Sequence, residues 1–435
     1  MNSLGRLLGP KKGDDMDVEM VFKAVEEKAD LLAKMLSDII RIDTSVPPGR
    51  NYPELVGFIE PLLERAGLRN ERVVVPEEVW RKIPLPLEGE RVNLVASMDS
   101  GKPPVSIYAH MDVVPAGVGW TVEPFAGKIE DGEVFGRGAV DMKGTIPPAV
   151  LAMEVIGELG LEPRFDVRLL FCTDEEIGID PGAAYLAREG YFKPPVIHLE
   201  GGGQGPAMIA ANAGSLKATI TAVGREVHSG LSFMGINALE EMLPVLEELM
   251  ELKRVVELRE SSFSSFPFPG VPSDKLTPTF NLNIMTAGEK LNIVPGEAEL
   301  QIDRRFLPEE KVEDAQAEIE AAVNRARGIS KAERLDAEFV TIYLPHSIDT
   351  HSPHVERWNE GVRLALGLPA DLDFIYPGTT GATDMSFVKD ILKTDQFVGT
   401  GVMDLEHTGA HQADECVPVK NMVHLCQELI YFLVD

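Results

Sequence analysis

The sequence predicts an α/β fold in which a mixed-sheet domain is interrupted by a smaller α+β domain. Before residue 213 and again after residue 345, helical periodicity alternates with short strand-like runs that are typical of a buried sheet. Between these parts the order of predicted elements is βαββαβ, which forms a compact α+β unit. We therefore expect residues 1–213 and 346–435 to form one domain and residues 214–345 to form an inserted one.

The first part of the chain carries two predicted helices and three predicted strands. Two amphipathic helices are indicated between Met20 and Ala66 by apolar residues at helical spacing, which are Leu31, Leu32, Met35, Leu36 and Ile39 in the first and Leu55, Phe58, Ile59, Leu62 and Leu63 in the second. Apolar runs that end in polar clusters indicate buried strands at Val92–Ala96, Val105–Ala109 and Val167–Cys172. Because open sheets bind ligands beyond the carboxyl ends of their strands, the polar residues after these runs are candidates for a site.

The inserted part has a different pattern, with alternating strands and charged helices. SLKATITAVG is a predicted strand, and the helix predicted next, over Asn237–Lys253, contains Pro244. The elements predicted after it are strands at Thr277–Thr286 and Glu297–Phe306, a helix over Glu309–Arg327, and a strand at Ala337–Leu344. A Ser/Pro/Gly-rich loop is expected at residues 261–273.

Length, charge and cysteine content narrow the class of protein. A chain of 435 residues favours two domains. The formal net charge of −29 repels phosphate backbones and anionic lipids, so neither nucleic acid nor a membrane is an expected partner. The three cysteines are odd in number and without CxxC spacing, and signal-peptide and membrane-spanning patterns are missing, so we expect a cytoplasmic protein. About the first fifteen residues are expected to form a loose tail.

The first two candidate metal ligands are His110, at the end of a predicted strand, and Asp141, in the next motif. In YAHMDVVP, His110 and Asp112 lie two apart on an extended backbone, which suits a metal ligand and the carboxylate that orients its ring. Asp141 lies in the glycine-rich stretch DGEVFGRGAVDMKG and could bridge two metal ions. The alternative for Asp141 is a helix cap, since Pro147 and Pro148 mark the start of a helix.

Further carboxylates and histidines follow later strands. Glu175 and Glu176 come directly after a buried strand in LLFCTDEEIG, and Glu200 ends VIHLEGG. EHTGAHQADE offers His411, with His407 as its rival. Two histidines and three carboxylates suit borderline divalent metals such as zinc. Paired ions about 3.5 to 4 Å apart would polarise a carbonyl and acidify a shared water, which Glu175 could deprotonate.

Five motifs together resemble the co-catalytic zinc metallopeptidase family that includes acetylornithine deacetylase, succinyl-diaminopimelate desuccinylase, carboxypeptidase G and aminoacylase. They are SIYAHMDVVP, GRGAVDMKG, CTDEEIG, HLEGG and GAHQADE, in the family's order. The resemblance implies that His110 and Glu200 hold one ion, that Glu176 and His411 hold the other, and that Asp141 bridges them. It also implies that Glu175 is the general base, that Asp112 orients a ligand, and that the peptide after Asp141 is cis.

The resemblance also implies a substrate class. Glu200, where the aminopeptidase branch has aspartate, favours N-acyl amino acids or short peptides with a free carboxylate. Deacylase and dipeptidase or carboxypeptidase activities both remain open. The expected cofactors are two divalent ions, zinc first, with cobalt or manganese as alternatives.

The inserted domain resembles the family's lid, which also forms the dimer. GREVHSG implies that His228 reaches the active site of a partner in a homodimer and stabilises an oxyanion. LNIVPGEAELQIDRRFLP implies substrate contacts by Asn292 and Arg305, with Arg304 as the alternative to Arg305. PGTTGATDMSF is a looser match to a substrate loop and contributes Gly381 and Thr383. A non-catalytic binding protein on the same scaffold is the rival interpretation, but the full set of ligands and a base favour an enzyme.

Overall fold

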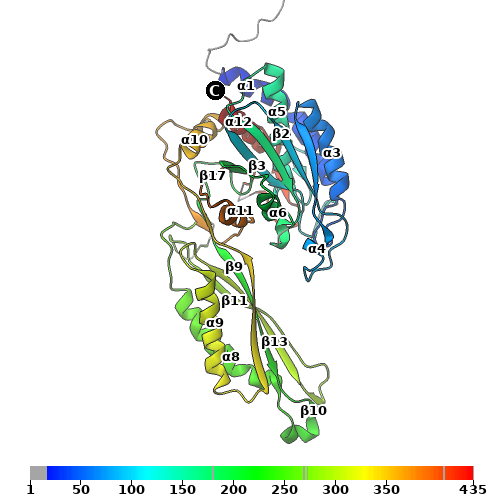
Figure 1. Cartoon of the computed structure of the whole chain (residues 1–435), viewed down its shortest axis with the longest axis vertical. Coiled ribbons are helices and arrows are strands. Elements are labelled where there is room, and N and C mark those ends of the chain that lie inside the picture. The colour runs from blue at the N-terminus through cyan, green and yellow to red at the C-terminus, as the bar shows by residue number, and fades with distance from the viewer. Residues whose placement is uncertain (1–16, 179–180, 268–269, 272, 405–406, 435) are drawn as a thin grey trace, which may run out of the picture. The chain divides into compact units, whose positions relative to one another are not determined.

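A computed structural model describes residues 17–178, 181–267, 270–271, 273–404 and 407–434 (Figure 1). The predicted N-terminal tail lies outside these residues, and the predicted loop at 261–273 is described only in part. The chain divides into two compact units. Of the described residues, the first unit contains those up to Met208, then Ile348–Ile375 and Val388 onwards, and the second contains Ile209–Ser347 and Tyr376–Phe387.

The first unit is built on a six-stranded mixed sheet with the order β1-β2-β6-β3-β7-β17. Its strands are β1 (Arg69–Val74), β2 (Val92–Met98), β3 (Pro104–His110), β6 (Asp166–Cys172), β7 (Val196–His198) and β17 (Phe397–Val398). Strands β6, β3, β7 and β17 run parallel to one another, whereas β2 pairs antiparallel with both β1 and β6. The three predicted strands are β2, β3 and β6, and the predicted α/β class with a mixed sheet is confirmed.

Helices of the first unit pack on this sheet and on one another. They are α1 (Val18–Glu26), α2 (Ala29–Ile40), α3 (Tyr52–Arg65), α4 (Glu77–Trp80), α5 (Ile146–Leu159), α6 (Ala183–Arg188), α10 (Pro353–Ala365) and α12 (Val419–Leu433). Helix α12 is buried along most of its length and contacts α5, α10 and α2. The two helices predicted between Met20 and Ala66 are α2 and α3. Helix α1 was not predicted, and the backbone leaves the helical region at Lys28 (φ −106°, ψ 13°), which separates α1 from α2.

The second unit contains a four-stranded antiparallel sheet with the order β11-β13-β9-β14. Its strands are β9 (Gly214–Val223), β11 (Thr279–Ala287), β13 (Glu297–Phe306) and β14 (Arg334–Tyr343), and helices α8 (Leu243–Val256) and α9 (Val312–Arg327) lie together on one of its faces (Figure 1). Alternate residues of the strands form one apolar core with the inner faces of the two helices. This is the predicted βαββαβ order.

Two helix boundaries in the second unit differ from the prediction. The segment predicted as one helix over Asn237–Lys253 is α7 (Ala238–Glu241) followed by α8, with Pro244 in the first turn of α8. A proline fits there because its missing N–H has no partner in a first turn, whereas inside a helix it removes a hydrogen bond. Helix α9 begins at Val312, three residues after the predicted start at Glu309.

A small three-stranded sheet brings the end of the chain beside the segment around residue 133. Strands β4 (Lys128–Glu130), β5 (Glu133–Phe135) and β18 (Cys416–Pro418) pair antiparallel in the order β18-β5-β4. The remaining short elements are β8 (Ala211–Asn212), β10 (Val227–His228), β12 (Ile293–Val294), β15 (His346–Ser347), β16 (Gly378–Thr379), α11 (Met385–Leu392), and the 3-10 turns η1 (Lys143–Thr145), η2 (Glu175–Ile177) and η3 (Ser229–Met234). Within the described ranges, none of the helices has the length and apolar character needed to span a membrane.

Candidate metal centre

Three parallel strands of the first unit deliver the candidate residues to one edge of the sheet. His110 is the last residue of β3 and lies opposite Cys172, the last residue of β6. Glu175 and Glu176 follow β6 directly, in the turn η2. Glu200 follows β7, whose His198 lies opposite Tyr108 of β3, so the same register brings Glu200 to the level of His110.

His110, Asp141, Glu176 and His411 converge although they are far apart in the sequence. One oxygen of Asp141, Oδ1, lies 3.1 Å from Nε2 of His110, and the other, Oδ2, lies 3.1 Å from Nε2 of His411. The same His411 nitrogen lies 3.1 Å from Oε1 of Glu176. Ligand atoms of His110, Asp141 and Glu176 all lie within 4.8 Å of one another. Asp141 is therefore placed between two histidines with one oxygen toward each.

The cluster strongly favours bound positive charge. Burial alone would raise the pKa of Asp141, but hydrogen bonds from His110 and His411 outweigh it and hold that pKa well below its usual range. Hydrogen bonds to Asp141 and Glu176 raise the pKa of His411 to about 10. Burial, together with the negative charge of Asp141, raises the pKa of Glu176 to about 7. Buried carboxylates in contact are costly unless protons or cations neutralise them.

The donor atoms fit divalent metals of the zinc type. Imidazole nitrogens and carboxylate oxygens are the ligands that zinc shares with cobalt and manganese. A buried oxygen beside the cluster agrees with this: Oδ1 of Asp112 has no hydrogen-bond partner within the described part of the chain and lies 3.6 Å from Nδ1 of His110. Ligation through Nε2 fixes the ring proton on Nδ1, where it faces Asp112.

Asp112 holds the turn that carries Glu175 and Glu176 as well as the ring of His110. Its Oδ2 accepts a hydrogen bond from the backbone N–H of Glu176 at 2.9 Å. The nearest acceptor for Nδ1 of His110 is the backbone oxygen of Asp112, at 3.0 Å, rather than its carboxylate. Asp174 starts the turn with φ 61° and Gly178 ends it with φ 66°, so both flanking residues adopt the left-handed conformation. Glu175 is buried between them.

The loop that carries Asp141 is fixed by two residues that the sequence analysis did not single out, Arg137 and Glu415. The buried Glu415 carboxylate accepts hydrogen bonds from the backbone N–H groups of Val140 at 2.9 Å and Asp141 at 3.2 Å. Arg137 pairs with Glu415 at 2.5 Å and donates to the backbone oxygen of His411 at 3.3 Å. Both residues lie within motifs of the family resemblance, GRGAVDMKG and GAHQADE, and their opposite charges were the available signal.

Asp141 is not a helix cap. The helix after it, α5, begins at Ile146 and takes Thr145 as its N-cap residue. The peptide bond between Asp141 and Met142 is cis, as the family resemblance implied. Gly138 upstream has φ 85°, and a Cβ atom there would lie 2.4 Å from Val113, so the close approach of this loop requires glycine.

Two other candidates have different partners in this structure. Glu200 contacts His198, with Oε2 at 2.8 Å from Nε2. His407, the rival of His411, pairs with Glu133 at 2.5 Å and not with Asp141 or Glu176. Of the two histidines in EHTGAHQADE, His411 is therefore the one in the cluster.

The remaining candidates lie in the second unit. His228 is exposed, accepts a hydrogen bond at Nδ1 from the N–H of Gly230 at 3.1 Å, and lies beside Asn292, whose backbone oxygen accepts from Ser229. Arg304 is buried and paired with Glu310 at 2.9 Å, whereas Arg305 is partly exposed and contacts Asp303 at 3.1 Å.

The loop before α11 contains Gly381 and Thr383. The N–H of Gly381 donates to the hydroxyl of Thr379 at 3.1 Å. The buried Thr383 accepts a hydrogen bond from the N–H of Met385 at 3.3 Å, which places its hydroxyl at the start of α11.

Comparison with known proteins agrees with this geometry. The model of peptidase family M20/M25/M40 matches residues 106–434. A probable succinyl-diaminopimelate desuccinylase of Staphylococcus aureus is 28% identical over 292 residues, which cover 63% of this chain and 67% of that protein.

Solved structures of similar fold cover almost the whole chain. A metallo-carboxypeptidase of Sulfolobus solfataricus has a TM-score of 0.75 at 17% identity, over 92% of this chain and 98% of its own. A Bacillus subtilis dinuclear metal binding peptidase has a TM-score of 0.62 at 16% identity, over 94% and 98%. The family match extends from β3 to the end of α12 and includes every residue of the cluster. The chain therefore belongs to peptidase family M20/M25/M40 and is a metal-dependent hydrolase.

Proposed function

We propose that this hydrolase cleaves the amide bond of N-acyl amino acids or short peptides that carry a free carboxylate. The observation that carries the proposal is Asp141, whose two oxygens each contact a different histidine. A carboxylate in that position can bridge two cations, with His110 as a ligand on one side and His411 and Glu176 on the other. The dinuclear metal binding peptidase of Bacillus subtilis, which shares the fold, supports two ions.

Glu200 completes the proposed ligand set on the His110 side. Its contact with His198 involves one oxygen, Oε2, at 2.8 Å, and a cation at His110 would compete for that carboxylate. Two ions bound here would supply Lewis acidity, which polarises the scissile carbonyl and lowers the pKa of a water between them. Zinc is the expected metal, with cobalt or manganese as alternatives.

Glu175 is the proposed general base. It is buried beside the cluster, and its negative charge is one of the causes that raise the pKa of His110. Glu175 would take a proton from the attacking water and pass it to the nitrogen that leaves when the amide bond breaks, so the proton is conserved. Asp112 fixes this geometry through the backbone N–H of the neighbouring Glu176.

Residues of the second unit are the proposed substrate contacts. Arg305 presents a guanidinium that is partly exposed, whereas Arg304 is buried against Glu310, so Arg305 is the better candidate for a paired contact with a carboxylate. Asn292, Gly381 and Thr383 would add polar contacts, and His228 would stabilise the oxyanion. The name of one relative, a desuccinylase, supports an N-acyl amino acid as the substrate, and the name of one structural neighbour, a metallo-carboxypeptidase, supports a peptide with a free C-terminal carboxylate. The two names favour these substrates equally.

A homodimer formed through the second unit is part of this proposal. The turn η3, directly after His228, exposes three large apolar side chains, Leu231, Phe233 and Met234. Exposed apolar residues clustered on one turn are typical of a surface that binds another protein. A second copy of the chain would cover them and bring His228 toward the partner's active site.

The test is removal and restoration of metal with the full-length protein. We expect a chelator to abolish hydrolysis of a panel of N-acetyl and N-succinyl amino acids and dipeptides, and zinc, cobalt or manganese to restore it. Elemental analysis should give at least two ions per chain in the restored protein. Undiminished hydrolysis by protein shown to be metal-free would contradict the proposal.

A further inference from the structure

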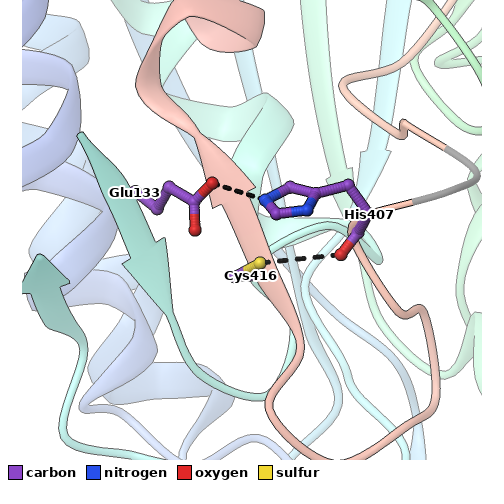
Figure 2. A group of neighbouring side chains, drawn as sticks. All are labelled: Glu133, His407 and Cys416. Atoms are coloured by element: carbon purple, nitrogen blue, oxygen red, sulfur yellow. Dashed lines mark hydrogen bonds and ion pairs between the residues drawn. The ribbon is translucent and has the colours of Figure 1, made fainter. Parts of the chain in front are cut away.

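A second group of metal-ligand side chains lies outside the centre described above. Among the described residues, Glu133, His407 and Cys416 each offer one ligand atom, and these atoms lie within 4.8 Å of one another (Figure 2). Nε2 of His407 lies 2.5 Å from Oε1 of Glu133, and Sγ of Cys416 lies 3.9 Å from the backbone oxygen of His407. A carboxylate, an imidazole and a thiol thus face one another.

Strand pairing fixes the positions of Glu133 and Cys416 relative to each other. Glu133 belongs to β5 and Cys416 to β18, and these strands pair antiparallel with Glu133 opposite Pro418 and Cys416 opposite Phe135. Residues two apart on paired strands lie on the same face, so Glu133 and Cys416 are diagonal neighbours. The Cys416 side chain is buried, that of Glu133 is 22% exposed and that of His407 is 51% exposed. His407 can therefore adjust toward the two fixed ligands.

Negative charge surrounds the thiol. Burial, followed by the charges of Glu133 and Glu415, raises the pKa of Cys416 to about 11. Glu133 and His407 also line a surface groove of about 1120 Å³, whose walls include the carboxylates of Glu26, Asp131 and Asp404. These carboxylates attract cations, and the groove leaves an open route from solvent to Glu133 and His407.

We propose that Glu133, His407 and Cys416 form a second metal site, separate from the centre at Asp141, which takes Zn²⁺ or another thiophilic divalent cation. A thiolate, an imidazole and a carboxylate are all zinc ligands, with bonds of roughly 2.0 to 2.3 Å. In a tetrahedral arrangement such ligands lie about 3.3 to 3.8 Å apart, so His407 moves away from Glu133 by less than about 1.5 Å. The thiol releases its proton to solvent when the metal–sulfur bond forms, and water is the fourth ligand.

The position of this site gives it a structural role. His407 precedes His411 in the same loop, whose backbone is held by bonds from Thr408 to Asp404 and from Cys416 to Thr408. A metal at His407 would join that loop to β5 and β18, and so limit the movement of His411. This role rests on the proposed function, whereas binding of the metal does not.

Cobalt substitution in the full-length protein tests the binding. A thiolate bound to Co²⁺ gives a sulfur-to-metal charge-transfer band in the near ultraviolet, and the proposed ligands at the Asp141 centre contain no sulfur. We expect the band in the wild type and in Cys426→Ala, which removes another buried thiol, and we expect its loss in Cys416→Ala. His407→Ala should weaken Co²⁺ binding at this site at least about tenfold.

Zinc stoichiometry gives an independent readout. After loading and gel filtration, the wild type and Cys426→Ala should hold one more equivalent of zinc per chain than Cys416→Ala, with all three proteins folded by circular dichroism. A wild type without the charge-transfer band, or a band that persists in Cys416→Ala, would overturn the proposal. Neither result depends on hydrolysis, so failure of this site is distinguishable from failure of the proposed reaction.

Discussion

Glu175 and Glu176 are adjacent carboxylates for which we propose different tasks. Glu176 contacts His411 within the cluster, whereas Glu175 is buried next to it and acts on His110 through its charge. Consecutive residues after a strand project in different directions, which lets one side chain bind metal while its neighbour transfers a proton. The pair therefore offers a matched comparison at the level of single residues.

Glu175→Gln keeps the size of the side chain and removes its basicity. We expect kcat to fall by about 10²- to 10⁴-fold, because general-base catalysis contributes that much, while both metal ions stay bound. Glu176→Gln is the matched variant and should lose one ion, as measured by elemental analysis alongside steady-state kinetics. Retained turnover in Glu175→Gln, or a loss of metal from it, would refute the assignment of the base.

Asp112 shows how far the role of a single residue could be predicted. The spacing of two residues between His110 and Asp112 predicted an orienting contact, yet the closer contact is made by the backbone oxygen of Asp112. The carboxylate instead accepts from the backbone of Glu176, a residue that follows a different strand. Contacts between segments far apart in sequence depend on strand register, which local patterns do not contain.

At the scale of elements, one buried ion pair joins the two loops that carry Asp141 and His411. Glu415 lies just before β18 and accepts from the backbone of Val140 and Asp141, while Arg137 reaches the backbone of His411. Both charges are almost completely buried. Removing one partner of a buried pair leaves the other charge uncompensated, at a cost of about 3 to 5 kcal/mol.

Glu415→Gln should therefore weaken metal binding without removing any proposed ligand. We expect the affinity for zinc, measured by competition with a chelator, to fall about 10- to 100-fold, as for other residues that hold metal ligands in place. Glu309→Gln is the control, because Glu309 also accepts backbone and hydroxyl hydrogen bonds, from Ser261 and Ser262, but lies in the second unit. Equal zinc affinities in the two variants would show that the link between the loops has no effect on the centre.

Element types were predicted well and their boundaries less well, for reasons visible in particular residues. Apolar runs predicted β2, β3 and β6, because buried strands need continuous apolar side chains. Helix α1 was missed, and the break at Lys28 that separates it from α2 is marked by neither glycine nor proline. The predicted helix over Asn237–Lys253 contains Pro244, but the sequence alone does not show that this proline lies in the first turn of a new helix, α8.

At the scale of the whole molecule, the motifs predicted which distant residues come together, whereas hydrophobic periodicity alone predicts only the helices and strands. His110, Asp141, Glu176 and His411 come from four separate segments, and the structure brings all four into direct contact. The assembly of two chains is different, because a single sequence and a single chain contain only one side of an interface. Whether His228 serves the active site of a partner stays a prediction.

Complementation between two inactive variants tests that prediction. Glu175→Ala removes the base from its own active site but keeps His228, and His228→Ala does the reverse. If His228 acts across a homodimer, each mixed dimer contains one complete active site, while each pure dimer contains none. Co-expression with random pairing should then recover about a quarter of the wild-type kcat, because half of the dimers are mixed and half of their sites are complete. Differently tagged chains, purified through both tags, should reach about half of the wild-type kcat.

Two outcomes would contradict the prediction. A mixture no more active than its two parents would show that His228 acts within its own chain or not at all. A single-chain mass by light scattering at full activity would exclude the dimer.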